Sequence, residues 1–220
     1  MRLPSPPLLV ISDRRQARHS LETVAAAAFE AGCRWFSLRE KDLPSDERRA
    51  VLSTLITLGR RYGATVSVHD DLEAALETGA PGLHLPSGGN PAAARARFPD
   101  GLIGGSAHSA EEAIQLLSAG ADFVTVSPVF TTASKPGYGP ALGLEGLAGV
   151  VTQAPGPVIA LGGITAQSAG LCLAAGARGV AIMGEVMRAA DPRAAVGAIL
   201  GAISGNNPGG ELRRPKNAMR

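Results

Sequence analysis

The sequence has few cysteines, few aromatic residues and almost no net charge. Its two cysteines, Cys33 and Cys172, show no metal-ligand spacing and lie among Ala, Gly and apolar residues, so we expect reduced structural thiols of a cytosolic protein. Aromatic residues make up 4%, which predicts an aliphatic core. The formal charge of +2 argues against a nucleic-acid or membrane surface.

Long apolar runs are also missing. The stretch from Ala25 to Ala28 is too short to cross a bilayer. The proline-rich start reaches its first strand-like run at Leu8 without the apolar region of a signal peptide. These absences predict a cytoplasmic protein with no membrane segment and no nucleic-acid partner.

The sequence does contain a regular alternation of strand-length apolar runs and Ala/Leu-rich segments of helix length. Because parallel neighbours need a crossover, this alternation predicts a parallel sheet. Eight such units indicate an α/β fold, a single (β/α)8 TIM barrel over residues 1–203. The expected strands are Leu8–Ser12, Trp35–Arg39, Thr65–Val68, Gly82–Leu85, Leu102–Ser106, Phe123–Val126, Val158–Leu161 and Gly179–Met183.

A doubly wound open sheet is the alternative fold. The first strand is not followed by a Gly-x-Gly-x-x-Gly motif, which lowers the weight of that alternative. Residues 204–220, rich in glycine and then basic, are expected to form a disordered tail.

The expected fifth strand ends in a hydroxyl and an imidazole, those of Ser106 and His108. Ser109 with Glu112 three residues later is typical of a capping box, so a helix should begin there. Side chains at this point of an α/β fold lie on its catalytic edge, and histidine suits proton transfer near neutral pH. His108 is therefore the candidate general acid/base.

Other strand ends carry groups suited to anions. Gly163 and Gly184 follow the expected seventh and eighth strands, where backbone N–H groups of barrel enzymes often bind phosphate. The simpler interpretations are that these glycines only tighten turns and that the charged side chains after other strands are solvated loop residues. Further candidates for binding an anionic substrate are Arg39, Lys41, Thr132, Ser134 and Lys135.

Three histidines, His69, His84 and His108, are expected at neighbouring strand ends, with Asp70 beside the first. Such a set could bind zinc and activate water. No pair of these histidines has i, i+2 or i, i+4 spacing, and His84 is instead expected to be a packed barrel residue.

The order of several motifs resembles the thiamine phosphate synthase/TenI superfamily. The resemblance covers nearly the whole chain up to the tail and implies the same barrel. The motifs are Ser37-Leu38-Arg39-Glu40-Lys41, Gly82-Leu83-His84-Leu85-Pro86-Ser87, Gly105-Ser106-Ala107-His108-Ser109, Ser127-Pro128-Val129-Phe130-Thr131-Thr132-Ala133-Ser134-Lys135, Leu161-Gly162-Gly163-Ile164 and Gly179-Val180-Ala181-Ile182-Met183.

This resemblance implies one of two activities. A thiamine phosphate synthase joins a pyrimidine diphosphate to a thiazole phosphate and releases pyrophosphate with Mg²⁺. This chain departs from the synthase pattern: Ser37 replaces a Gln, His69 an Asn, and Gly89 an Asp that helps to hold the metal. Of the metal carboxylates, Asp70 alone remains, and Gly89 offers no side-chain oxygen.

The stretch from His84 to Ser87 resembles the TenI branch, a thiazole tautomerase that aromatises a thiazole carboxylate phosphate by a proton shift. That resemblance favours a cofactor-free isomerase with His108 as the proton carrier. It implies that Gly163 and Gly184 bind the phosphate. Five residues that would bind pyrophosphate in a synthase either face the carboxylate here or are relics: Arg39, Lys41, Ser106, Ser134 and Lys135. A Mg²⁺-dependent synthase and a non-catalytic regulator that binds a phosphate ligand are the alternatives. The expected partner is a small-molecule thiazole phosphate substrate, and a homo-oligomer is possible.

Overall fold

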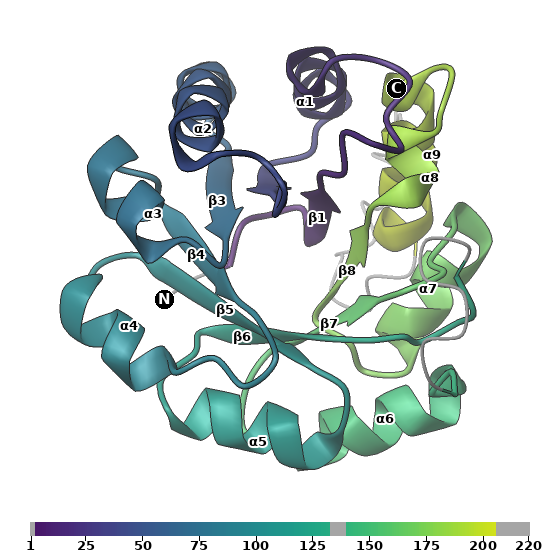
Figure 1. Ribbon diagram of the computed structural model, residues 1–220. Coiled ribbons are helices and arrows are strands. Elements are labelled where there is room, and N and C mark those ends of the chain that lie inside the picture. Colours follow the sequence, from purple (N-terminus) through teal and green to yellow (C-terminus); the bar gives the residue numbers. More distant parts are fainter. Residues whose placement is uncertain (1–2, 133–139, 206–220) are drawn as a thin grey trace, which may run out of the picture.

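The strands form a closed parallel barrel in which each strand pairs with its neighbours in the sequence and β8 closes against β1 (Figure 1). The computed structural model describes residues 3–132 and 140–205. Within these residues the strands are β1 (Leu8–Ile11), β2 (Trp35–Leu38), β3 (Thr65–His69), β4 (Gly82–Leu85), β5 (Leu102–Ala107), β6 (Phe123–Val126), β7 (Val158–Leu161) and β8 (Gly179–Ile182). The predicted (β/α)8 barrel is confirmed.

Helices surround the barrel, one after each strand and a second after β8 (Figure 1). Several begin at a side chain that caps free backbone N–H groups, such as Ser20, Asp71, Asn90 and Asp191. The helices are α1 (Leu21–Glu30), α2 (Ser45–Arg61), α3 (Leu72–Thr78), α4 (Pro91–Arg97), α5 (Ala110–Ser118), α6 (Gly143–Gln153), α7 (Ala166–Ala174), α8 (Gly184–Met187) and α9 (Pro192–Ser204). The one-turn helix α8 was not expected from the sequence.

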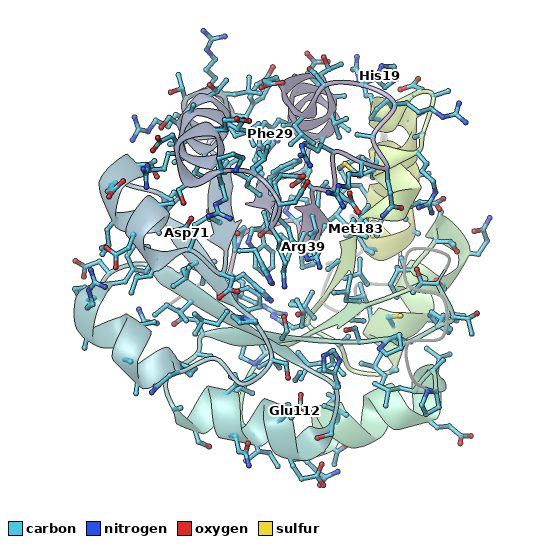
Figure 2. The ribbon with its side chains drawn as sticks, viewed as in Figure 1. His19, Phe29, Arg39, Asp71, Glu112 and Met183 are labelled. Carbon is cyan, nitrogen blue, oxygen red and sulfur yellow. The ribbon has the colours of Figure 1, made fainter. Side chains whose placement is uncertain are left out.

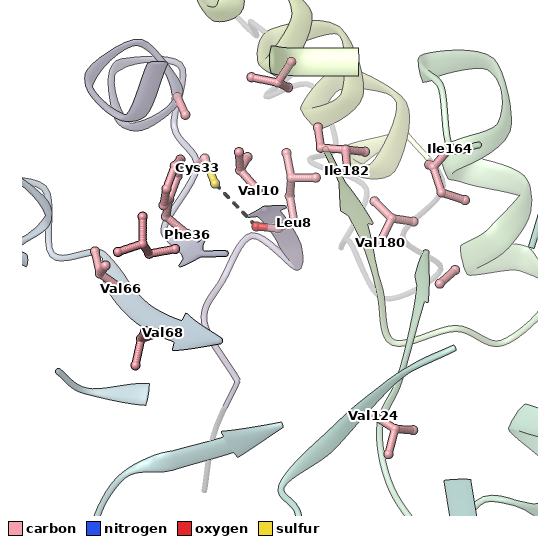
Figure 3. Packing of buried hydrophobic residues seen from close by; sticks show 14 of the residues in the cluster. Leu8, Val10, Cys33, Phe36, Val66, Val68, Val124, Ile164, Val180 and Ile182 are labelled. Atoms are coloured by element: carbon pink, nitrogen blue, oxygen red, sulfur yellow. Dashed lines mark hydrogen bonds between the residues drawn. The ribbon is translucent and has the colours of Figure 1, made fainter. Parts of the chain in front are cut away.

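Two apolar clusters account for the apolar runs in the strands. Alternate strand residues, such as Leu8 and Val10 of β1, face outwards and pack against the helices (Figure 3). The residues between them, such as Leu9 of β1 with Trp35 and Phe123, fill the barrel interior. The rings of Trp35 and Phe123 meet edge to face at 4.7 Å, so the interior below the carboxyl ends of the strands is solid.

Both cysteines are buried free thiols, in agreement with the structural role expected for them. The Cys33 Sγ–H donates to the carbonyl of Leu8 at 3.4 Å (Figure 3), and burial raises its pKa to about 11. Of the helices in the described ranges, none combines the length and apolar character needed to cross a membrane. Helix α9 includes Ser204, the first residue of the tail predicted over residues 204–220, and residues 206–220 lie outside the described residues.

Candidate active site

Two neighbouring pockets open where the strands end. The glycine pocket, about 280 Å³, is lined by loops after β6, β7 and β8. The histidine pocket, about 250 Å³, is lined by residues of β1 to β7 and of the loops after β2, β4, β5 and β6. Both pockets include Ile11, Arg39, Ser127 and Leu161, so they share a wall and can hold two groups side by side.

The glycine pocket depends on close backbone packing between the loops after β6 and β7. Gly162 and Gly163 have φ angles of +99° and +65°, a region that disfavours side chains. A Cβ on Gly163 would lie 2.5 Å from the carbonyl oxygen of Thr131. The loops are joined where the Phe130 N–H donates to the Gly162 carbonyl at 3.0 Å. The glycines therefore allow Thr131 and Thr132 to lie beside the β7 turn, where both line the pocket.

Arg39, labelled in Figure 2, lines both pockets, and the buried pair Ser12 and Glu40 fixes its backbone. The Arg39 N–H donates to Ser12 Oγ at 2.8 Å, and that hydroxyl donates to Glu40 Oε1 at 2.6 Å. The Glu40 carboxylate also accepts from the backbone N–H of Arg14. Burial raises the pKa of Glu40, while these hydrogen bonds oppose the rise. Exposed Lys41 adds a second cation to the histidine pocket.

His84 is a buried, neutral member of the histidine pocket. The residue is 4% exposed. Its ring stacks on His69 with centroids 5.3 Å apart and places Nε2 3.1 Å from Ser106 Oγ and 3.2 Å from Thr125 Oγ1. Burial, and then the charge of Arg39, lower its pKa to about 4. His84 therefore supports the pocket wall, in agreement with the expectation of a packed barrel residue, and it orients Ser106.

His108 lies directly after β5, and its ring Nδ1 is held by a backbone carbonyl. Its Nδ1 is 2.7 Å from the carbonyl oxygen of Ser127, which only accepts, so Nδ1 carries the hydrogen and Nε2 is the basic nitrogen of the neutral ring. The His108 N–H donates to Glu112 Oε2 at 2.8 Å, and Ser87 Oγ donates to the same oxygen at 3.3 Å. Half-buried and lining the histidine pocket, His108 is placed for proton transfer.

The predicted helix start at Ser109 is confirmed, but the Glu112 carboxylate accepts from a different backbone N–H than a capping box predicts. Ser109 Oγ accepts from the Glu112 N–H at 3.2 Å, as in a capping box. The Glu112 carboxylate turns to the His108 N–H, one residue earlier than the Ser109 N–H that a capping box would use. Glu112 of α5, labelled in Figure 2, thus also fixes the backbone of the candidate acid/base.

The predicted site residues divide into three groups. Arg39, Lys41, Ser106 and His108 line the histidine pocket. Arg39, Thr132, Gly163 and Gly184 line the glycine pocket. Ser134 and Lys135 lie outside the described residues.

A Mg²⁺ site with two carboxylates does not fit the described residues. Asp70 is exposed, has a φ of +57° and lines neither pocket, and Gly89 has no side chain to offer. His69, His84 and His108 all line the histidine pocket. Across residues 3–132 and 140–205, however, no group of three or more His, Cys, Asp or Glu side chains is arranged to hold a metal ion. The donors that a zinc site would need are therefore not assembled here.

Residues that the sequence analysis missed also shape the site. Arg188 lines the glycine pocket from the end of α8, one helical turn after Gly184. Ser12 and Glu40 fix the backbone of Arg39. Glu40 belongs to the motif Ser37-Leu38-Arg39-Glu40-Lys41, but no role was predicted for it. The four-residue spacing from Gly184 to Arg188 is a weak signal, and no local pattern links Ser12 to Glu40.

A closed (β/α)8 barrel with polar pockets at the carboxyl ends of its strands defines a TIM-barrel enzyme. A family model described as thiamine monophosphate synthase matches residues 8–186. The chain belongs to this family, whose chemistry is part of thiamine biosynthesis, and the resemblance seen in the motifs is confirmed.

Individual relatives cover most of the chain. A putative thiamine-phosphate synthase of Geobacter sulfurreducens is 39% identical over 199 residues, 89% of this chain and 93% of the relative. A thiamine-phosphate synthase of Roseiflexus is 36% identical over 89% of this chain and 84% of its own. The structure of a thiamine phosphate pyrophosphorylase from Pyrococcus furiosus matches with a TM-score of 0.82 and 33% identity, covering 90% of this chain and 95% of that one.

Proposed function

We propose that this protein is a thiamine-phosphate synthase, which joins a pyrimidine diphosphate to a thiazole phosphate and releases pyrophosphate. The names of its relatives favour this transferase over the tautomerase that the sequence had favoured. The observation that carries the proposal is the pair of pockets sharing Arg39, because a condensation of two anionic substrates needs two anion-binding positions side by side.

In this proposal the two small-molecule substrates occupy different pockets. The thiazole phosphate places its phosphate in the glycine pocket, near Gly163 and Gly184. The diphosphate lies in the histidine pocket beside Arg39 and Lys41. A C–O bond to the diphosphate breaks while the thiazole nitrogen forms the new C–N bond. Negative charge grows on the departing pyrophosphate, and the two cations stabilise it.

The tautomerase remains a second candidate because of the geometry of His108. Its Nδ1–H is held by the Ser127 carbonyl, so Nε2 is the basic nitrogen of the neutral ring, and His108 lines a pocket that also contains Arg39 and Lys41. A proton shift needs one such base and anion contacts. The absence of a side chain at Gly89 also favours this candidate, because a tautomerase does not require the missing carboxylate.

One pair of assays separates the two functions. Purified protein is given both synthase substrates with Mg²⁺ and, separately, the non-aromatic thiazole tautomer with EDTA. Pyrophosphate release that falls at least about 100-fold in Arg39→Met supports the synthase. The control is Arg178→Ala, an exposed arginine at the start of β8, the opposite end of the barrel. Absence of pyrophosphate release, together with aromatisation that is lost in His108→Asn, refutes the synthase and supports the tautomerase.

A further inference from the structure

The guanidinium of Arg188 is held over the start of α8, at the rim of the glycine pocket. A Cβ built on Gly184 would lie 2.2 Å from Arg188 Nη1 and 2.6 Å from its Cζ. The guanidinium therefore occupies the space that a side chain at position 184 would need. Gly184 gives Arg188 this position, and both residues line the pocket that contains the Gly162-Gly163 turn.

A chain of side chains from the loop after β1 braces Arg188. Arg188 Nη1 donates to Gln16 Oε1, and Gln16 Nε2 donates to Asp13 Oδ2 at 2.5 Å. Because a carboxylate only accepts, Asp13 fixes which end of the Gln16 amide faces the arginine. The backbone N–H of Arg18 donates to the Met187 carbonyl at 2.9 Å and ties the same loop to α8. The guanidinium is thus oriented before any ligand binds, which lowers the entropy cost of using it.

Arg188 supplies positive charge to the glycine pocket. The described lining residues include two arginines, Arg39 and Arg188, and one carboxylate, Glu185. Arg39 also belongs to the histidine pocket, so Arg188 is the cation specific to the glycine pocket. A planar guanidinium can bind two oxygens of a phosphate monoester at once.

We propose that Arg188 binds the phosphate monoester of the substrate in the glycine pocket and selects it over the unphosphorylated alcohol. Gln16 is its positioning residue, and Gly184 is glycine because the guanidinium needs that space. This inference rests on the proposed function for the identity of the substrate as a thiazole phosphate. It adds a side-chain determinant of specificity to the backbone contacts expected at Gly163 and Gly184.

Calorimetric binding of thiazole phosphate and of the corresponding thiazole alcohol tests the proposal. Arg188→Met is expected to weaken binding of the phosphate about 10- to 100-fold and to leave binding of the alcohol unchanged. Arg188→Lys should restore part of the loss, and Gln16→Ala should cost a few-fold. Arg178→Ala is the control.

Gly184→Ala provides a second test, because its Cβ would displace the Arg188 guanidinium without removing it. It should weaken phosphate binding much as Arg188→Met does, and the double variant should be no worse than either single variant. An unchanged ratio of phosphate to alcohol affinity in Arg188→Met, or no preference for phosphate in the wild-type protein, overturns the inference. Because binding is measured directly, an Arg188-dependent preference without condensation refutes only the proposed function.

Discussion

Acidification is expected to destabilise this protein through His84. Burial lowers the pKa of His84 from 6.5 to about 4 in the folded state. The unfolded chain therefore takes up a proton at a higher pH than the folded chain does. The stabilisation is complete above the unfolded pKa, and it is lost as the pH falls from about 6.5 to about 4. In the described part of the chain His84 Nδ1 has no hydrogen-bond partner, so a proton added there would have no acceptor.

The size of the effect follows from the shift. With pKa values of 6.5 and about 4, lowering the pH from about 7 to about 5 removes about 2 kcal/mol from the free energy of unfolding. Other groups contribute to the total pH dependence, so the informative quantity is the difference between the wild-type protein and His84→Gln. The variant is expected to lose about 2 kcal/mol less over this range, whatever its stability at neutral pH.

Urea unfolding monitored by circular dichroism at the two pH values measures this difference. His19→Gln is the matched control, because the His19 ring is exposed at the end of the loop before α1. An equal acid-induced loss in the wild-type protein and His84→Gln would show that the ring is not held neutral by burial. A loss that disappears equally in His19→Gln would refute the assignment to His84.

Three further perturbations test other parts of the structure. Ser12→Ala removes the hydroxyl that donates to buried Glu40 and should lower the free energy of unfolding by about 1–3 kcal/mol, as urea titrations can measure. An unchanged urea midpoint would contradict the buried hydrogen bond. Gly163→Ala places a Cβ against the Thr131 carbonyl at a φ of +65°, so we expect a Tm lower by several degrees and weaker binding of thiazole phosphate in calorimetry. Burial raises the pKa of Cys33 to about 11, so a thiol reagent at neutral pH should label it only after denaturation. Peptide mass spectrometry measures the labelling, and rapid labelling of the native protein would contradict the burial of this thiol.

The barrel could be predicted because each strand is buried on both faces and stands out as an apolar run. The runs Gly82–Leu85, Phe123–Val126 and Val158–Leu161 match the observed strands β4, β6 and β7. Other ends differ by one residue: β2 stops at Leu38, before Arg39. Helix α8 has only four residues, too few for an apolar periodicity to develop, and it could not be recognised from the sequence.

The site was predictable where its residues directly follow a strand, and not where they meet across loops. His108 and Gly163 were found because the carboxyl ends of barrel strands gather functional groups. The contact of Gln16 with Arg188 joins residues 172 positions apart, and no local pattern encodes it. The contact of the Glu112 carboxylate with the His108 N–H was not predicted, because a capping box already explained why a glutamate stands at this position.

Closure of the barrel has a consequence for how the chain folds during synthesis. Strand β1 pairs with β8 through Leu8 and Val180, so the two edges of the sheet meet only after nearly the whole chain has been made. Until then a nascent sheet presents unpaired backbone N–H and C=O groups at the β1 edge. Contacts of such long sequence separation slow folding and prolong exposure of that edge. Pairing of β8 with β1 therefore removes this exposed edge, at which other chains could otherwise pair and aggregate.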